Sequence, residues 1–199
     1  MLGKLIKVGR WLVIALLVMA VLFVAINSQF FIKQVNFWWG QDVSHKAIPI
    51  NPTATDVPDQ IQIPALQVQA PLVYIDSTDV LTVQSALAQG VVHYPGTVLP
   101  GEFGNAFYFG HSSDFISKPG RYKTVFALLP RIEIGQEILV NDGRGRQFTY
   151  RVVSKQVVPA TATEWLDQGD RRRRLLTLQT SYPVGTAIAR YIVQAEIKQ

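Results

Sequence analysis

The sequence predicts a mainly β domain, closed or nearly closed into a barrel with a few short helices, behind one N-terminal transmembrane helix. From Gln60 onward, many short runs rich in β-branched and aromatic residues are separated by glycine and proline, which is typical of a barrel. One long apolar stretch, at residues 11–32, lies before them. The 199 residues of the chain, less this stretch, leave room for one domain of about 140 residues, large enough to bury a hydrophobic core.

The apolar stretch is long enough to cross a bilayer. Trp11 to Ile26 is continuously apolar, the polar residues Asn27 to Gln29 interrupt it, and Phe30 to Ile32 resume it. As one helix, residues 11–32 would measure roughly 33 Å at about 1.5 Å per residue, which spans the hydrocarbon core. A cleaved signal peptide is the alternative. Because no small-x-small cleavage site follows the apolar run, we expect an uncleaved anchor.

The charges that flank this stretch predict its orientation. Residues 1–10 contain Lys4, Lys7 and Arg10, whereas basic residues are sparser after the stretch. The positive-inside rule therefore places residues 1–10 in the cytoplasm and everything after Ile32 outside the cell.

Residues 33–59 are expected to be an extracellular linker between the membrane and the domain. From Ser44 to Asp59 the linker contains three prolines among Thr, Asn and Asp residues, a composition typical of extended segments. Phe37 to Trp39 fits two interpretations equally well, contact with the membrane interface or a loose apolar loop. The domain itself should occupy residues 60–199.

Within the domain, apolar and β-branched runs predict strands at 60–63, 66–74, 105–110, 136–140, 146–158, 174–180 and 189–197. Short helices are expected at about 79–88, 123–129 and 162–168. Asn141-Asp142-Gly143 separates two of the strands and has the composition of a hairpin turn.

The composition excludes several classes of function. The net charge is +5, but the three basic residues before the apolar stretch and the run Arg171 to Arg174 account for more than all of it. A nucleic-acid-binding protein should spread basic side chains over a surface, so we expect no nucleic-acid partner. The chain has no cysteine, which excludes disulfides and thiolate metal sites. No acidic pair has metal-ligand spacing, so neither a metal nor another cofactor is expected.

The last two predicted strands bring two functional groups together. If 174–180 and 189–197 pair as an antiparallel hairpin, Ser181 and Arg190 become neighbours, a hydroxyl beside a fixed cation. The best candidate for a general base is His111, directly after the strand that ends in Gly110. The pKa of a histidine suits proton transfer near neutral pH. These three side chains are a plausible site for acyl transfer.

These segments resemble the sortases, membrane-anchored transpeptidases of the bacterial cell surface. The family has a histidine after a strand, a cysteine nucleophile in Thr-Leu-x-Thr-Cys and an arginine on the next strand. This chain has Gly110-His111, then Thr177-Leu-Gln-Thr-Ser181, then Arg190. The order and spacing of further segments agree from about Gln60 to the C-terminus, including Ile63 to Pro71. The resemblance implies an eight-stranded sortase barrel.

The resemblance also implies a reaction and its partners. A sortase cleaves a Leu-Pro-x-Thr-Gly-like sorting motif of secreted surface proteins and transfers the acyl group to an amine of peptidoglycan precursor or pilin. Arg190 would stabilise the negative charge on the carbonyl oxygen. Thr180 and His93 are expected at the substrate-binding site. His93 is also a rival to His111 as base, or a histidine with a purely structural role.

Ser181 departs from the family pattern, and this departure leaves three interpretations open. A neighbouring cation can ionise a thiol but not a serine hydroxyl, so the enzyme would be inactive or strongly impaired. A serine-type enzyme would instead need His111 as a base, with a group such as Asp114 to orient it. The third interpretation is a binding module that holds a sorting peptide without turning it over. The Arg171 to Arg174 run is either a solvated surface or a contact for anionic lipid or wall polymer.

Overall fold

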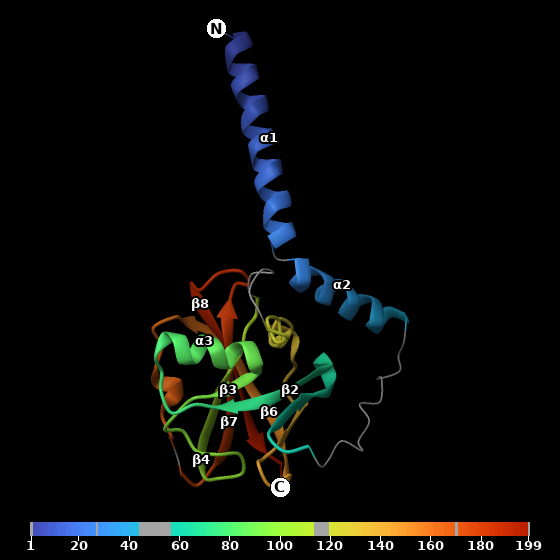
Figure 1. Ribbon diagram of the computed structural model, residues 1–199. Coiled ribbons are helices and arrows are strands. Elements are labelled where there is room, and N and C mark those ends of the chain that lie inside the picture. The colour runs from blue at the N-terminus through green and yellow to red at the C-terminus, as the bar shows by residue number, and fades with distance from the viewer. Residues whose placement is uncertain (1, 27, 44–56, 114–119, 170, 199) are drawn as a thin grey trace.

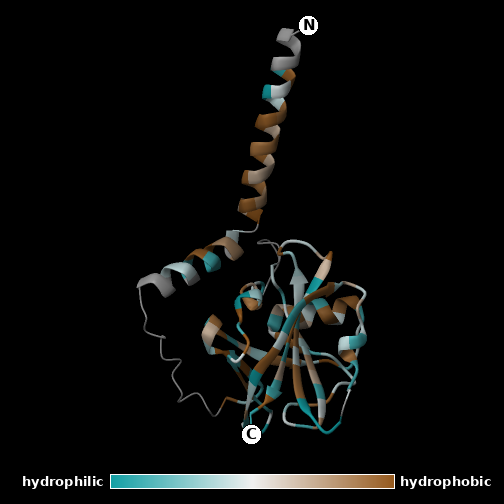
Figure 2. Ribbon diagram, turned by 180° about the vertical axis from the view of Figure 1, so that it is seen from behind, coloured by the Kyte–Doolittle hydropathy of each residue, from teal (hydrophilic) through white to brown (hydrophobic). Residues whose placement is uncertain are grey.

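The computed structural model describes residues 2–26, 28–43, 57–113, 120–169 and 171–198. Helix α1 (Leu2–Ile26) projects away from the rest of the chain, and helix α2 (Ser28–Val43) lies at an angle to it beside one end of the domain (Figure 1). The segment Lys7–Ile26 is not buried against the rest of the chain, and most of it is hydrophobic, as its colour in Figure 2 shows. Its length and composition suit a membrane span.

The helical part differs from the expectation of one helix over residues 11–32. Phe30 to Ile32 belong to α2, which begins at Ser28 and continues to Val43, within the segment expected to be linker. Polar residues near position 28 are unfavourable in hydrocarbon, which is a physical reason for the apolar helix to end before them. The Lys33 ammonium of α2 donates a hydrogen bond to the Thr124 carbonyl oxygen at 2.8 Å, and so joins this helix to the domain.

Eight strands form a closed barrel in the order β1-β2-β3-β4-β7-β8-β6-β5, with β1 also paired to β5. The strands are β1 (Gln60–Ile63), β2 (Val68–Tyr74), β3 (Val91–His93), β4 (Gly104–Phe109), β5 (Glu137–Asn141), β6 (Gln147–Pro159), β7 (Arg174–Tyr182) and β8 (Ala189–Ile197). Most pairs are antiparallel, whereas β2–β3 and β4–β7 are parallel. This architecture confirms the predicted mainly β, eight-stranded barrel.

The barrel interior is filled by alternate residues of the strands. Leu176 and Leu178 of β7 and Val193 of β8 are fully buried in one cluster with the rings of Tyr108 and Tyr150. Each residue of a strand points to the opposite face from its neighbour, so the residues between these face outward. This alternation decides which side chains can form a site on the outer face.

The predicted helix at 79–88 is confirmed as α3 (Val80–Gln89), the short helix predicted around 162–168 is present as a 3-10 helix of three residues, and the helix predicted at 123–129 is wrong. The Asp79 carboxylate begins α3 by accepting hydrogen bonds from the backbone N–H groups of Leu81 and Thr82. Residues 123–129 form successive turns that lead into a 3-10 helix, Leu129–Arg131, and a second 3-10 helix occupies only Glu164–Leu166. Residues 123–129 are buried throughout, so they lack the solvated face of an amphipathic helix.

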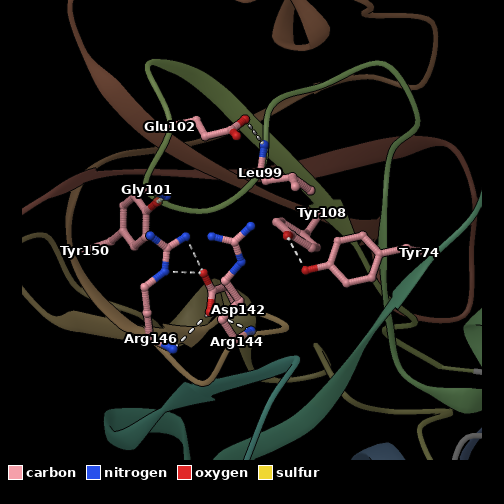
Figure 3. Close-up of polar contacts among 9 residues, drawn as sticks. All are labelled: Tyr74, Leu99, Gly101, Glu102, Tyr108, Asp142, Arg144, Arg146 and Tyr150. Carbon is pink, nitrogen blue, oxygen red and sulfur yellow. Dashed lines mark hydrogen bonds and ion pairs between the residues drawn. The ribbon is translucent and has the colours of Figure 1, made fainter.

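The hairpin between β5 and β6 is confirmed, but its connection is longer than the predicted turn. Asp142 accepts hydrogen bonds from the backbone N–H groups of Arg144 and Arg146 and forms an ion pair with the Arg146 guanidinium at 2.7 Å (Figure 3). The Gly145 N–H bonds to the Asp142 carbonyl oxygen, and Gly145 has a φ of 76°. The β5–β6 connection is therefore a longer loop stabilised by hydrogen bonds to the Asp142 side chain, and not the short turn that the sequence predicted.

Candidate active site

Three predicted site residues lie level with one another in one row: His111 two residues beyond the end of β4, Ser181 near the end of β7 and Arg190 near the start of β8. The parallel β4–β7 pairing ends with Phe109 opposite Gln179, and extending this register by two residues brings His111 level with Ser181. Ser181 is paired directly with Arg190 in the antiparallel β7–β8 ladder. Residues directly opposite one another in a sheet point to the same face. The histidine, the serine and the arginine are all half-buried.

The row is on the outer face of the barrel. Thr180 is paired with Tyr191, which belongs to the interior cluster, so their neighbours Ser181 and Arg190 point outward. The row also lies at the end of the barrel next to the two N-terminal helices. A cavity of about 460 Å³ there is lined by Phe23 of α1, residues of α2, and Tyr182 to Val184 directly after the serine.

The backbone around His111 is fixed by its neighbours. The Gly110 N–H donates to the Gln179 carbonyl oxygen at 3.1 Å, and the His111 carbonyl oxygen accepts from the Phe126 N–H at 2.9 Å. The Thr180 hydroxyl donates to the Gly110 carbonyl oxygen at 2.8 Å. Thr180 is 2% exposed, so it lies beneath the row and braces the residue before His111. Its contact with substrate stays a prediction.

Glycine at position 110 is required by close packing. A β-carbon there would lie 2.8 Å from the Phe126 ring and 2.9 Å from Val125 Cγ1. Gly110→Ala should therefore cost about 1–3 kcal/mol of unfolding free energy, as overpacking usually does, and displace His111. Urea denaturation of the full chain measures the loss.

Gly143→Ala is the matched control for this substitution. A β-carbon at Gly143 would come no closer than 3.3 Å to the Asp59 carboxylate, so a smaller loss is expected. Equal losses in the two variants would show that the packing against Phe126 is not what requires glycine at 110.

Two loops border the row. The Gly185 N–H, in the β7–β8 loop, donates to the Ser113 hydroxyl two residues beyond His111 at 3.0 Å. Arg190 Nη1 donates to the carbonyl oxygens of Ala187 and Ala189, both at 3.1 Å. A guanidinium has five N–H donors, so a rigidly held Arg190 retains donors for an oxyanion. Asp114, the sequence candidate for orienting the histidine, lies outside the described residues.

His93 lies apart from this row. It is paired with the interior residue Tyr108 and is 5% exposed. Its ring packs between those of Tyr74 and Tyr108, with centroids 5.3 Å and 5.0 Å away. Nε2 lies 3.0 Å from the Val98 carbonyl oxygen and 2.9 Å from the Thr97 hydroxyl. These contacts suit a structural histidine, and its role with substrate stays a prediction.

The environment of His93 predicts a pH dependence of stability. Burial lowers its pKa from the ordinary 6.5, and the hydrogen bond to Val98 and the charge of Glu102 oppose the shift only in part. The unfolded chain therefore binds a proton more readily. The contribution of neutral His93 to the unfolding free energy is fully present above pH 6.5. It is lost as the pH falls from there toward the lowered pKa.

Urea denaturation between about pH 7.5 and about pH 5 measures this effect, with His93→Gln as the comparison. The wild-type chain should lose more unfolding free energy on acidification than the variant, because only in the wild type does residue 93 bind a proton more readily in the unfolded chain than in the folded one. The same pH slope in both proteins would contradict the assignment to His93.

The β6–β7 loop is held against β4 by polar residues that the sequence analysis did not identify. The Asn105 amide donates to the Trp165 carbonyl oxygen at 2.8 Å, and its oxygen accepts from the buried Thr177 hydroxyl at 2.7 Å. The Gln168 amide donates to the Asn105 carbonyl oxygen at 3.2 Å. A polar residue within each of two apolar strands, at 105 and 177, was the signal in the sequence. Within the described part of the chain, no three acidic or histidine side chains are placed to hold a metal ion.

Comparison with known proteins agrees with this geometry. The family model of the sortase domain matches residues 61–198, which is most of the chain. A search of curated protein sequences gave no significant match.

Many solved structures share the fold, and three illustrate the range. Sortase C-1 from Actinomyces oris is 24% identical with a TM-score of 0.59, over 85% of this chain and 99% of that one. Sortase A from Corynebacterium diphtheriae is 24% identical with a TM-score of 0.58, over 70% and 60% of the two chains. Sortase C-1 from Streptococcus pneumoniae is 21% identical with a TM-score of 0.58, over 71% and 66%.

The chain thus spans less than two thirds of the length of the last two structures. At such identities the structural matches establish only that the barrel fold is shared. The assignment of the sequence to a family rests on the family model. On the match over residues 61–198, this chain belongs to the sortase family.

Proposed function

We propose that the chain is a sortase-type transpeptidase that acts on a Leu-Pro-x-Thr-Gly-like sorting motif and transfers the acyl group to an amine of the cell wall or a pilin. The observation that carries this proposal is the row formed by His111, two residues beyond the end of β4, with Ser181 of β7 and Arg190 of β8. A nucleophile, a base and a cation on rigid strands are the groups that acyl transfer requires.

The three side chains have different roles in the two steps of acyl transfer. The group at position 181 gives its proton to His111 and attacks the Thr–Gly carbonyl carbon, and Arg190 donates hydrogen bonds to the resulting oxyanion. Collapse of this intermediate expels the glycine amine, which takes a proton from His111. In the second step His111 accepts a proton from the acceptor amine, which attacks the acyl group, and His111 returns this proton to residue 181 as it leaves.

With serine at position 181, the first step should be strongly impaired. A serine hydroxyl must lose its proton during the attack, because a neighbouring guanidinium cannot ionise it beforehand. Such a proton transfer requires a well-oriented histidine. Ser181 is therefore also the observation that favours a second function, a non-catalytic module that binds sorting peptides on a sortase barrel.

The chain arrangement fits action at the cell surface. We propose that residues 1–10 are cytoplasmic, that the segment within 11–32 crosses the membrane, and that residues 33–59 connect it to the catalytic domain, 60–199, outside the cell. The row lies near the end of the barrel beside α1 and α2, because the residues directly after Ser181 share a cavity with both helices. A substrate anchored in the same membrane would reach the site from this end.

Peptide cleavage distinguishes the two functions. The full chain and its Ser181→Cys variant, in neutral detergent, are incubated with a panel of Leu-Pro-x-Thr-Gly-type peptides and an excess of an amine acceptor. Liquid chromatography with mass detection should show a transfer product from the cysteine variant. Peptide retention by both proteins, without any product, would support the binding module instead.

A further inference from the structure

A second charged feature lies at the other end of the barrel, where β7 begins and β8 ends. A cavity of about 770 Å³ is lined there by five basic side chains, Arg151, Arg172, Arg173, Arg174 and Lys198. Glu196 is the acidic residue of the same lining. These residues come from three strands and the loop before β7, so the fold gathers cations that the sequence shows only in part as the Arg171 to Arg174 run.

Among the described residues, two carboxylates lie beside the five cations of the cavity, those of Glu196 and Glu137. Arg173 forms a two-point ion pair with Glu196, at 3.0 Å from Nε and 2.6 Å from Nη2. Arg151 and Lys198 both approach the one carboxylate of Glu137, at 3.9 Å and 3.0 Å. The positive charges therefore outnumber these two carboxylates, and the cavity attracts anions.

The Arg174 guanidinium is held in place and has an unsatisfied hydrogen-bond donor. Its guanidinium carbon lies 4.3 Å from the centroid of the Phe103 ring, so the planar group rests on an aromatic face. Its Nε is buried and has no hydrogen-bond partner among the described residues. A buried charged donor without an acceptor is unfavourable, and a bound anion would compensate its charge. Guanidinium groups held in this way suit phosphate oxygens.

The position of the cavity indicates where the anion comes from. Arg174 and Ser181 are separated by roughly 23 Å along β7, at about 3.3 Å per residue. The start of β7 and the C-terminus lie at the end of the barrel far from α1 (Figure 1). A membrane crossed by α1 is therefore on the other side of the domain, and the cavity faces away from it.

We infer that this cavity binds a phosphate-bearing polyanion outside the membrane, such as a polymer of phosphate diesters. The cavity is much larger than one phosphate group, and its cations are spread over two strands, the loop before β7 and the residue after β8, so it suits several linked anions. Binding there would hold the membrane-distal end of the domain against a polymer layer while the row at residue 181 stays beside the membrane.

The test measures binding of fluorescently labelled poly(glycerol phosphate) to the full chain in nanodiscs of zwitterionic lipid, by fluorescence anisotropy. Arg172→Gln combined with Arg174→Gln should weaken binding at least about tenfold, because hydrogen bonds between charged groups are lost. Arg174→Lys keeps the charge but loses the guanidinium, and should also bind more weakly than the wild type. Arg121→Gln combined with Arg144→Gln removes the same charge elsewhere and should leave binding nearly unchanged.

Three results would overturn the inference. Equal weakening by the two double variants would show an effect of net charge alone. Binding to added phosphatidylglycerol vesicles that depends on Arg172 and Arg174, without binding to the polymer, would identify a membrane contact instead. If the double variant does not fold, the single variants Arg174→Lys and Arg172→Gln decide. Unchanged binding of the polymer by both would exclude the cavity as its binding site.

Discussion

Replacing Ser181 with cysteine is expected to raise the rate of acyl transfer by about 10²–10⁴-fold. A serine needs a general base to remove its proton during the attack, and a thiolate does not. The expected factor is the usual contribution of such a base. A free thiol has a pKa of about 8.5, which a nearby cation lowers. Arg190 is the direct cross-strand partner of position 181. Cysteine at this position would therefore be partly ionised near neutral pH, whereas serine would not.

Initial rates of peptide transfer, for the full-length wild type and for Ser181→Cys, measure this change. Ser85→Cys, which places a thiol on the exposed face of α3, is the matched control and should react no faster than the wild type. If the wild type already transfers peptide at the rate of the Ser181→Cys variant, Ser181 acts as a competent nucleophile and the group that orients His111 becomes the main question.

Replacing Arg190 with glutamine, in the Ser181→Cys protein, is expected to lower kcat by about 10²–10³-fold, as the loss of an oxyanion donor does. The arginine is placed for this task because its Nη1 is fixed by the carbonyl oxygens of Ala187 and Ala189. An interaction formed mainly in the transition state changes kcat rather than KM.

Steady-state kinetics separate this role from substrate binding. Arg144→Gln, an exposed arginine in the β5–β6 connection, is the control and should leave both constants unchanged. A variant at position 190 with a raised KM and an unchanged kcat would place Arg190 in peptide binding instead of charge stabilisation.

The strands of the site could be predicted because local sequence determines them. The last two strands each contain a run of consecutive buried residues within nine positions, and an antiparallel pair with a short connection is the simplest arrangement for them. Their pairing placed Ser181 beside Arg190. The position of His111 relative to Ser181 depends on the parallel pairing of β4 with β7. This pairing cannot be inferred from the sequence of either strand alone.

Other parts depend on distant contacts and could not be predicted. Strand β3 has only three residues, Val91 to His93, and is stabilised by pairing with β2 and β4. Asn105 and Trp165 are joined by a hydrogen bond across sixty residues of sequence. The basic cavity likewise combines Arg151, Lys198 and the end of the arginine run, which meet only when the barrel closes.

The most direct test of sortase chemistry in this chain is the intact mass of the protein after reaction with the sorting peptides. The Ser181→Cys protein should gain the mass of the acyl fragment that ends in the motif threonine, and tryptic mapping should place it at position 181. The wild type should gain little or none. If the Ser181→Cys protein gains no acyl mass with any peptide of the panel, the row of His111, position 181 and Arg190 does not perform acyl transfer on these motifs.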